Sequence, residues 1–257
     1  MSFSELVTEV KLQNKVLAIT RVHQKDEEPQ HTFGCIFKIL PRVLAGETIV
    51  TTAIHCGCKG FKCNSGLLDT PPFVQGGYGL FLSKGSTSAW SPDGERFKCD
   101  PDMAYAMFDH LPKDVMGGYD AFKIEPYYEG IECDIAVVFC NPDQFSAMTV
   151  LYYYDKPEYD RILAPGGAGC ASMFRIPLAE LKSDKPRAII TGTDLAQRKT
   201  MDEFDLAISF TGPEFKKMLS YTGECFFHAP VWKSARNRIR KDEHLEDACF
   251  TPLGTTE

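Results

Sequence analysis

Cysteines are the residues of this sequence best suited to chemistry, and they gather in a few glycine-containing segments. The chain has 257 residues and ten cysteines. The densest group is Cys56, Cys58 and Cys63, directly after His55. Thiolates are soft ligands for iron–sulfur clusters, zinc and copper(I), and interspersed glycines let a short loop bring several sulfurs together. The spacing therefore predicts a metal or cluster site, with His55 as a spectator; a loop with incidental cysteines is the alternative.

A second candidate is the glycine-rich turn at 164–172, which contains Gly167, Gly169 and Cys170. A strand is predicted before this turn and a helix after it. Backbone N–H groups at a helix start, together with the helix dipole, favour an anion and lower the pKa of a thiol. We expect an anionic ligand at the backbone from Gly167 to Cys170, and Cys170 as an activated nucleophile. The turn has only part of a dinucleotide fingerprint, and a tight turn with a buried Cys170 is the alternative.

Asp194 is the acidic residue most suited to join this turn. It follows a strand predicted at 187–193, and loops at neighbouring strand ends gather in α/β folds. Two acidic groups, Asp194 with Arg198 and Lys199, and Asp155 with Asp160, are each expected to be a cap or a surface charge, and only the first is placed to face the glycine turn.

Composition indicates an ordinary globular protein without a basic surface for nucleic acid. Hydrophobic residues make up 44% of the chain, charged residues 25%, and the net charge is 28 − 35 = −7. The basic residues of 233–241 are followed at once by acidic ones, as on a solvated helix face. The N-terminus does not resemble a signal peptide, and no run of about 18 apolar residues predicts a membrane span. We therefore expect a cytoplasmic protein, in which clustered thiols indicate metal or redox chemistry more than disulfides.

The remaining cysteines are expected to be small buried hydrophobes. They are Cys99, Cys133, Cys140, Cys225 and Cys249.

Hydrophobic periodicity predicts alternating helices and strands. The predicted helices are at 3–10, 33–45, 100–111, 142–154, from 170, from 212, and at 231–241, and Pro41 should kink or shorten the second of them. The predicted strands are at 16–22, 47–52, 119–125, 133–140, 161–163, 187–193 and 205–210. The glycine- and proline-rich stretch 56–98 is predicted to be irregular. This order indicates an α/β (or α+β) fold with a mixed sheet, helices packed on it and glycine-rich loops at strand ends. We expect a single domain over 1–257, with a weak subdivision near 118.

Several segments together resemble an uncharacterised prokaryotic family, domain of unknown function 169. They are Gly34-Cys35, Gly57-Cys58-Lys59-Gly60, the run 133–144 ending in Asn141-Pro142-Asp143-Gln144, the glycine turn 164–172, and 186–199 with Asp194. The resemblance covers roughly residues 33–235, and the order of the segments makes it specific.

The resemblance implies that Cys35, Cys58 and Cys170 are the family's shared cysteines. It implies an iron–sulfur or redox role, as the cysteines of these proteins from anaerobes have suggested. Cys56 and Cys63 look like additions in this chain rather than cysteines of the family pattern. Lys59 stands after Cys58, where the family has a proline.

Three functions follow from these observations. The leading one is a redox protein in which Cys58 and Cys170, with Cys35, Cys63 and Cys56, hold an iron–sulfur cluster or another thiophilic metal. Its partner would be a redox protein. The second is a thiol-dependent enzyme using Cys170 on a small anionic substrate. The third is a structural or interaction protein with inert cysteines. The sequence does not fix the oligomeric state.

Overall fold

Seven strands form one mixed sheet, as predicted. The computed structural model describes residues 2–32, 34–70, 77–84, 93–201, 205–237 and 239. The strands are β1 (Val16–Val22), β2 (Ile49–Thr52), β3 (Ala121–Pro126), β4 (Ile135–Cys140), β5 (Ile162–Leu163), β6 (Ala188–Thr191) and β7 (Leu206–Thr211). They lie in the order β2-β3-β1-β4-β7-β6-β5. Only the β5–β6 pair among the described strands is parallel.

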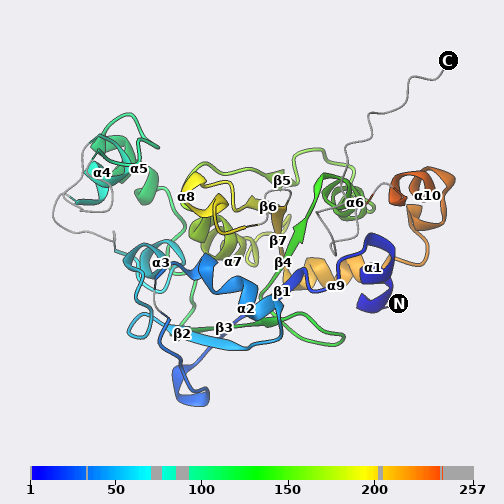
Figure 1. Ribbon diagram of the computed structural model, residues 1–257, viewed down its shortest axis with the longest axis horizontal. Coiled ribbons are helices and arrows are strands. Elements are labelled where there is room, and N and C mark those ends of the chain that lie inside the picture. The colour runs from blue at the N-terminus through cyan, green and yellow to red at the C-terminus, as the bar shows by residue number, and fades with distance from the viewer. Residues whose placement is uncertain are drawn as a thin grey trace.

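Helices cover both faces of this sheet (Figure 1). They are α1 (Phe3–Val10), α2 (Leu40–Leu44), α3 (Lys59–Asn64), α4 (Gly77–Leu82), α5 (Pro101–Asp109), α6 (Pro142–Tyr152), α7 (Ile176–Glu180), α8 (Leu195–Arg198), α9 (Gly212–Ser220) and α10 (Pro230–Arg236). The last helix was predicted to reach Lys241, which lies outside the described residues. Among the described helices, none has the length and apolar character needed to cross a membrane.

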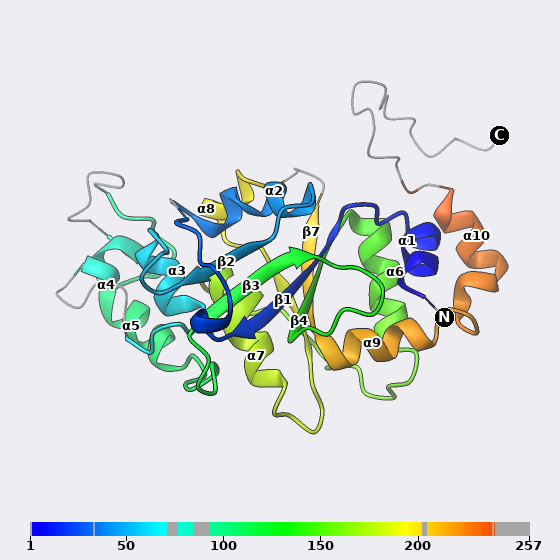
Figure 2. The same ribbon diagram turned by 90° about the horizontal axis from the view of Figure 1, so that it is seen from below.

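The central strand β4 shows why the sheet needs two layers of helices. All six of its residues are buried. Its even-numbered residues face one core, to which α1, α6 and α9 contribute, and its odd-numbered residues mostly face a second core under α2, α3 and α7. Successive strand side chains point to opposite faces, so an uninterrupted apolar run requires cover on both sides. In Figure 2, α3, α4 and α5 lie at one end of the molecule, and α1 and α10 at the other.

Local capping explains why two of the predicted helices begin where they do. Ser2 and Glu5 form a capping box at the start of α1, and Asn141 and Gln144 form another at α6. Each pair satisfies two backbone N–H groups that a helix start leaves unpaired.

Two segments that matter for the site differ from the prediction. The helix expected at 33–45, which Pro41 was expected to kink or shorten, is divided into a 3-10 helix, Ile36–Lys38, and α2; Phe33 lies outside the described residues. Pro41 explains this division, since proline is accommodated only in the first turn of a helix and therefore marks the start of α2. The stretch 56–98, expected to be irregular, contains α3 and α4.

The helix after the glycine turn begins with π-helical geometry over Ala171–Arg175 and continues as α7. Pro177 gives the physical reason, because its ring cannot accept the α-helical approach of the carbonyl four residues earlier. π-helical segments of this kind are frequent at functional sites.

Candidate functional site

Four cysteines from distant segments converge on the sheet face covered by α2, α3 and α7. Cys56 and Cys170 are buried in the same core, and Cys35 and Cys58 pack against it at intermediate exposure. Burial raises the pKa of Cys170 well above its ordinary value, and the nearby charges of Cys35, Cys58 and Cys56 raise it further. The thiols are therefore close enough to interact electrostatically. We call Cys35, Cys56, Cys58 and Cys170 the thiol cluster.

The thiols meet over the face of the sheet, not at one of its ends. Each of Cys58 and Cys170 follows a predicted strand, and the two strand ends would fall on one edge if the strands were parallel neighbours. They are not neighbours, because β2 and β5 lie at opposite edges of the sheet. The loops after these two strands instead turn inward over the same core.

The two partly exposed members of the thiol cluster, Cys35 and Cys58, lie at helix starts. Cys35 precedes the 3-10 helix rather than lying on a helix, as we had expected. Cys58 is the N-cap of α3, and its Sγ accepts a hydrogen bond from the N–H of Phe61 at 3.3 Å. Cys56 lies one glycine away, and its Sγ accepts from the N–H of Cys58 at 3.4 Å. A Cys-Gly-Cys loop thus places two sulfurs together.

Cys170 is not the activated thiol that the helix-start argument predicted. It is 4% exposed, and burial raises its pKa, which outweighs any effect of the following helix. The Nε2 of Gln197 lies 3.8 Å from its sulfur. Sequence reasoning missed Gln197, because the four-residue α8 that carries it has no apolar periodicity to mark it.

Asp194 joins the thiol cluster from the start of α8. Its carboxylate accepts a hydrogen bond from the N–H of Ala196 at 2.9 Å. Burial raises the pKa of this carboxyl, while the N–H groups of Ala196 and Gly169 oppose the rise. Asp194 in turn raises the pKa of Cys35 and Cys170, although burial is the larger cause for both. A carboxylate of the protein itself therefore faces part of the glycine turn where we expected an external anion.

The two predicted glycines of the turn are required for different reasons. Gly167 has φ +154°, a conformation that residues with a side chain rarely adopt. At Gly169, an added Cβ would lie 1.6 Å from Oε1 of Gln197. A cavity of about 20 Å³, room for one water, lies beside the turn, and Asn64, Gly167 and Ala168 are among its lining residues. Oδ1 of Asn64 is buried there without a hydrogen-bond partner.

Cys63 lies on α3 but packs apart from the thiol cluster, in a separate small core with Tyr78 and Phe108. Its carbonyl accepts a hydrogen bond from Arg175 at 2.6 Å, which fixes α3 against the π-helical segment. Arg175 is fully buried, and no local sequence pattern marks it as a buried residue.

The other cysteines only partly follow the expectation that they are buried. Cys140 and Cys225 are buried, and Cys133 is at intermediate exposure with its pKa raised by burial to about 12. Cys99 is exposed, so that prediction was wrong, and Cys249 lies outside the described residues.

No metal site is already assembled in the described part of the chain. No three His, Cys, Asp or Glu side chains there are arranged to hold an ion. The thiol cluster is thus a set of soft donors brought near one another without the geometry of a finished site.

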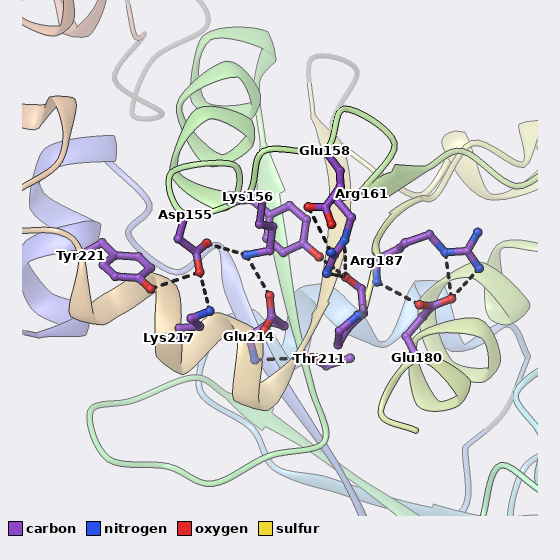
Figure 3. Close-up of polar contacts among 12 residues, drawn as sticks. Asp155, Lys156, Glu158, Arg161, Glu180, Arg187, Thr211, Glu214, Lys217 and Tyr221 are labelled. Carbon is purple, nitrogen blue, oxygen red and sulfur yellow. Dashed lines mark hydrogen bonds and ion pairs between the residues drawn. The ribbon is translucent and has the colours of Figure 1, made fainter. Parts of the chain in front are cut away.

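A separate charged cluster joins the loop after α6 to α9 (Figure 3). Asp155 accepts hydrogen bonds from Lys156 at 2.8 Å and from Tyr221 at 3.1 Å, and it also pairs with Lys217. Lys156 also pairs with Glu214 at 2.9 Å. Each charge has an opposite partner, so we interpret this cluster as a structural link.

The charged cluster predicts an acid-sensitive contribution to stability. Partial burial alone would raise the pKa of Asp155, but the two lysines outweigh it and lower the pKa from 3.8 to about 2. The folded state therefore favours the carboxylate, and this stabilisation is present above about pH 4 and lost as the pH falls toward 2. Solvent screens this surface cluster, so the loss should be about 0.5–1 kcal/mol.

Urea unfolding of the native protein and of Asp155→Asn between pH 5 and about 2 would measure this loss. The difference in free energy of unfolding between the two should shrink as the pH falls. Asp160→Asn, in the same loop but outside the cluster, is the control. An unchanged difference across this range would contradict the assignment.

These features define a mixed-sheet α/β protein with a cluster of thiols over one sheet face. The family model of domain of unknown function 169, described as an uncharacterised ArCR family, matches residues 5–221. The chain belongs to this family. No curated protein and no solved structure matches it.

Proposed function

We propose that the thiol cluster is a metal centre, most simply an iron–sulfur cluster or another thiophilic metal, in a protein with a redox role. The observation that carries this proposal is the convergence of four cysteines from three separate segments over one core: Cys35, the Cys56 and Cys58 pair, and Cys170. Buried thiols that raise one another's pKa hold their protons at neutral pH. A bound cation would offset the cost of forming thiolates in this buried site, so that metal binding would release the protons.

The donor set fits a soft metal in its chemistry. Four sulfurs are available, which is the number that iron–sulfur clusters and structural zinc sites use. Because the donors are not yet arranged around one point, metal binding would have to draw them together. Three glycines, at 34, 57 and 169, adjoin the four cysteines and give the backbone freedom to do so.

Metal and acid-labile sulfide analysis of protein prepared without oxygen or chelator tests the proposal. Iron with sulfide, or another thiolate-bound metal, is expected, with absorbance near about 400 nm for a cluster. Cys58→Ser and Cys170→Ser should each lower the metal content about tenfold or more. Cys225→Ser, which alters a buried thiol in the other core, should not.

Less than about a tenth of an equivalent of any transition metal in the native protein would contradict a metal centre. Thiol titration with and without denaturant then separates the remaining functions. Rapid reaction of a cluster thiol in the folded protein would favour thiol chemistry without metal. Reaction only after unfolding would favour inert cysteines. Because Cys170 is buried, a thiol enzyme would present Cys58 or Cys35 to its substrate.

A further inference from the structure

Only two thiols of the cluster can meet a molecule from solvent. Cys35 and Cys58 are at intermediate exposure, whereas Cys56 and Cys170 are buried. Any reactant that exchanges electrons, sulfur or metal with the cluster therefore approaches through the surface around Cys35 and Cys58. We call this surface the mouth of the cluster.

Two lysines lie one helical turn beyond the two cysteines of the mouth. The N–H of Lys38 donates to the carbonyl of Cys35 at 3.0 Å, and the N–H of Lys62 donates to the carbonyl of Cys58 at 3.2 Å. In keeping with this placement, burial raises the pKa of Cys35 and Cys56, and the charges of Lys38 and Lys62 respectively oppose the rise. Lys59 directly follows Cys58 on the first turn of α3 and is exposed.

This positive character does not follow from the overall charge of the chain, which is −7. Among the residues that the structure describes, Asp194 is the carboxylate whose charge acts on Cys35 and Cys170. It is partly buried and engaged with backbone N–H groups. Fixed charges around an opening raise the local concentration of ions of opposite sign and the rate at which they arrive.

We infer that the mouth selects a small anionic reactant for the thiol cluster, over neutral and cationic molecules of similar size. The inference rests on the proposed function only in taking the thiol cluster as the working site. The lysines act equally on metal-free thiols. The selection is therefore measurable whether or not a metal binds.

Thiol–disulfide exchange on the metal-free, reduced protein is the test. The probes are the dianionic dithiobis(nitrobenzoate) and the neutral dithiodipyridine. A protein thiolate attacks one sulfur of the probe, forms a mixed disulfide and releases the other half as a thiolate, while the thiol proton passes to buffer. Cys99 is exposed and Cys133 is at intermediate exposure, so the background carries Cys99→Ser, Cys133→Ser and Cys249→Ser.

At low ionic strength, the double variant Lys38→Glu, Lys62→Glu should react with the dianionic probe about tenfold more slowly, relative to its rate with the neutral probe. This loss of rate with the dianionic probe should disappear near about 0.5 M salt. The control is Lys185→Glu, Lys216→Glu, which makes the same charge change at two exposed lysines paired with Glu158 and Glu132. It should leave the ratio of the two rates unchanged.

Salt dependence of the background protein provides a second measurement that needs no charge variant. Added salt should slow the dianion and leave the neutral probe unaffected. The inference would be overturned if the ratio of the two reaction rates were the same in the background protein and both variants. It would also be overturned if salt did not change the rate with the dianionic probe.

Discussion

Arg175→Met should destabilise the protein by about 2–6 kcal/mol, chiefly the cost of leaving two backbone carbonyls without their donors. The guanidinium is 0% exposed and donates to the carbonyls of Pro112 and Cys63 and to the Asp69 carboxylate. Methionine fills much of the volume but leaves two carbonyls without donors. Each buried unsatisfied group costs about 1–3 kcal/mol.

Arg175→Met should disturb the thiol cluster as well as lower the free energy of unfolding. Arg175 ties together α3, the loop at Asp69 and the segment after α5, and α3 begins at Cys58. Without this link, α3 should be less firmly held on the sheet face.

Urea unfolding measures the change in the free energy of unfolding. The control is Arg42→Met, which removes an exposed arginine paired with the exposed Glu47 and should hardly move the unfolding midpoint. Equal stability of the two variants would show that the buried contacts of Arg175 contribute little.

The strands and helices of this fold were largely predictable from sequence because their determinants are local. The strand at 16–22 was predicted with its observed limits, and the capping boxes located α1 and α6. The short helices at 59–64 and 77–82 were missed because their glycines and polar residues obscure any periodicity.

The candidate site was less predictable because it depends on strand order. The motifs singled out the loops carrying Cys58 and Cys170, but the argument for their meeting assumed neighbouring parallel strands. No local pattern reveals that β2 and β5 occupy opposite edges, or that both loops fold over the same face. The pKa of Cys170 was misjudged for a related reason: burial is a property of the assembled core, and it dominates the effect of a helix start.

Gly169→Ala should cost about 2–3 kcal/mol and disturb the thiol cluster without changing any of its sulfurs. The new Cβ would lie 1.6 Å from Oε1 and 2.6 Å from Cδ of Gln197. Gln197 is buried, so its side chain has little room to yield. Moving it would take Nε2 away from the Cys170 sulfur and disturb the approach of Asp194 to the turn.

Gly166→Ala is the matched control in the same turn, since a Cβ there meets nothing within 4 Å and the backbone does not require glycine. It should be neutral or stabilising by up to about 1 kcal/mol, because alanine restricts the unfolded chain. Thermal or urea unfolding compares the two variants, and metal content measures the effect on the thiol cluster. Adding Gln197→Ala to Gly169→Ala removes the clashing atoms and should recover part of the lost stability. If Gly169→Ala matches Gly166→Ala in stability, or the second substitution recovers nothing, close packing of Gln197 on the turn is not what requires glycine at 169.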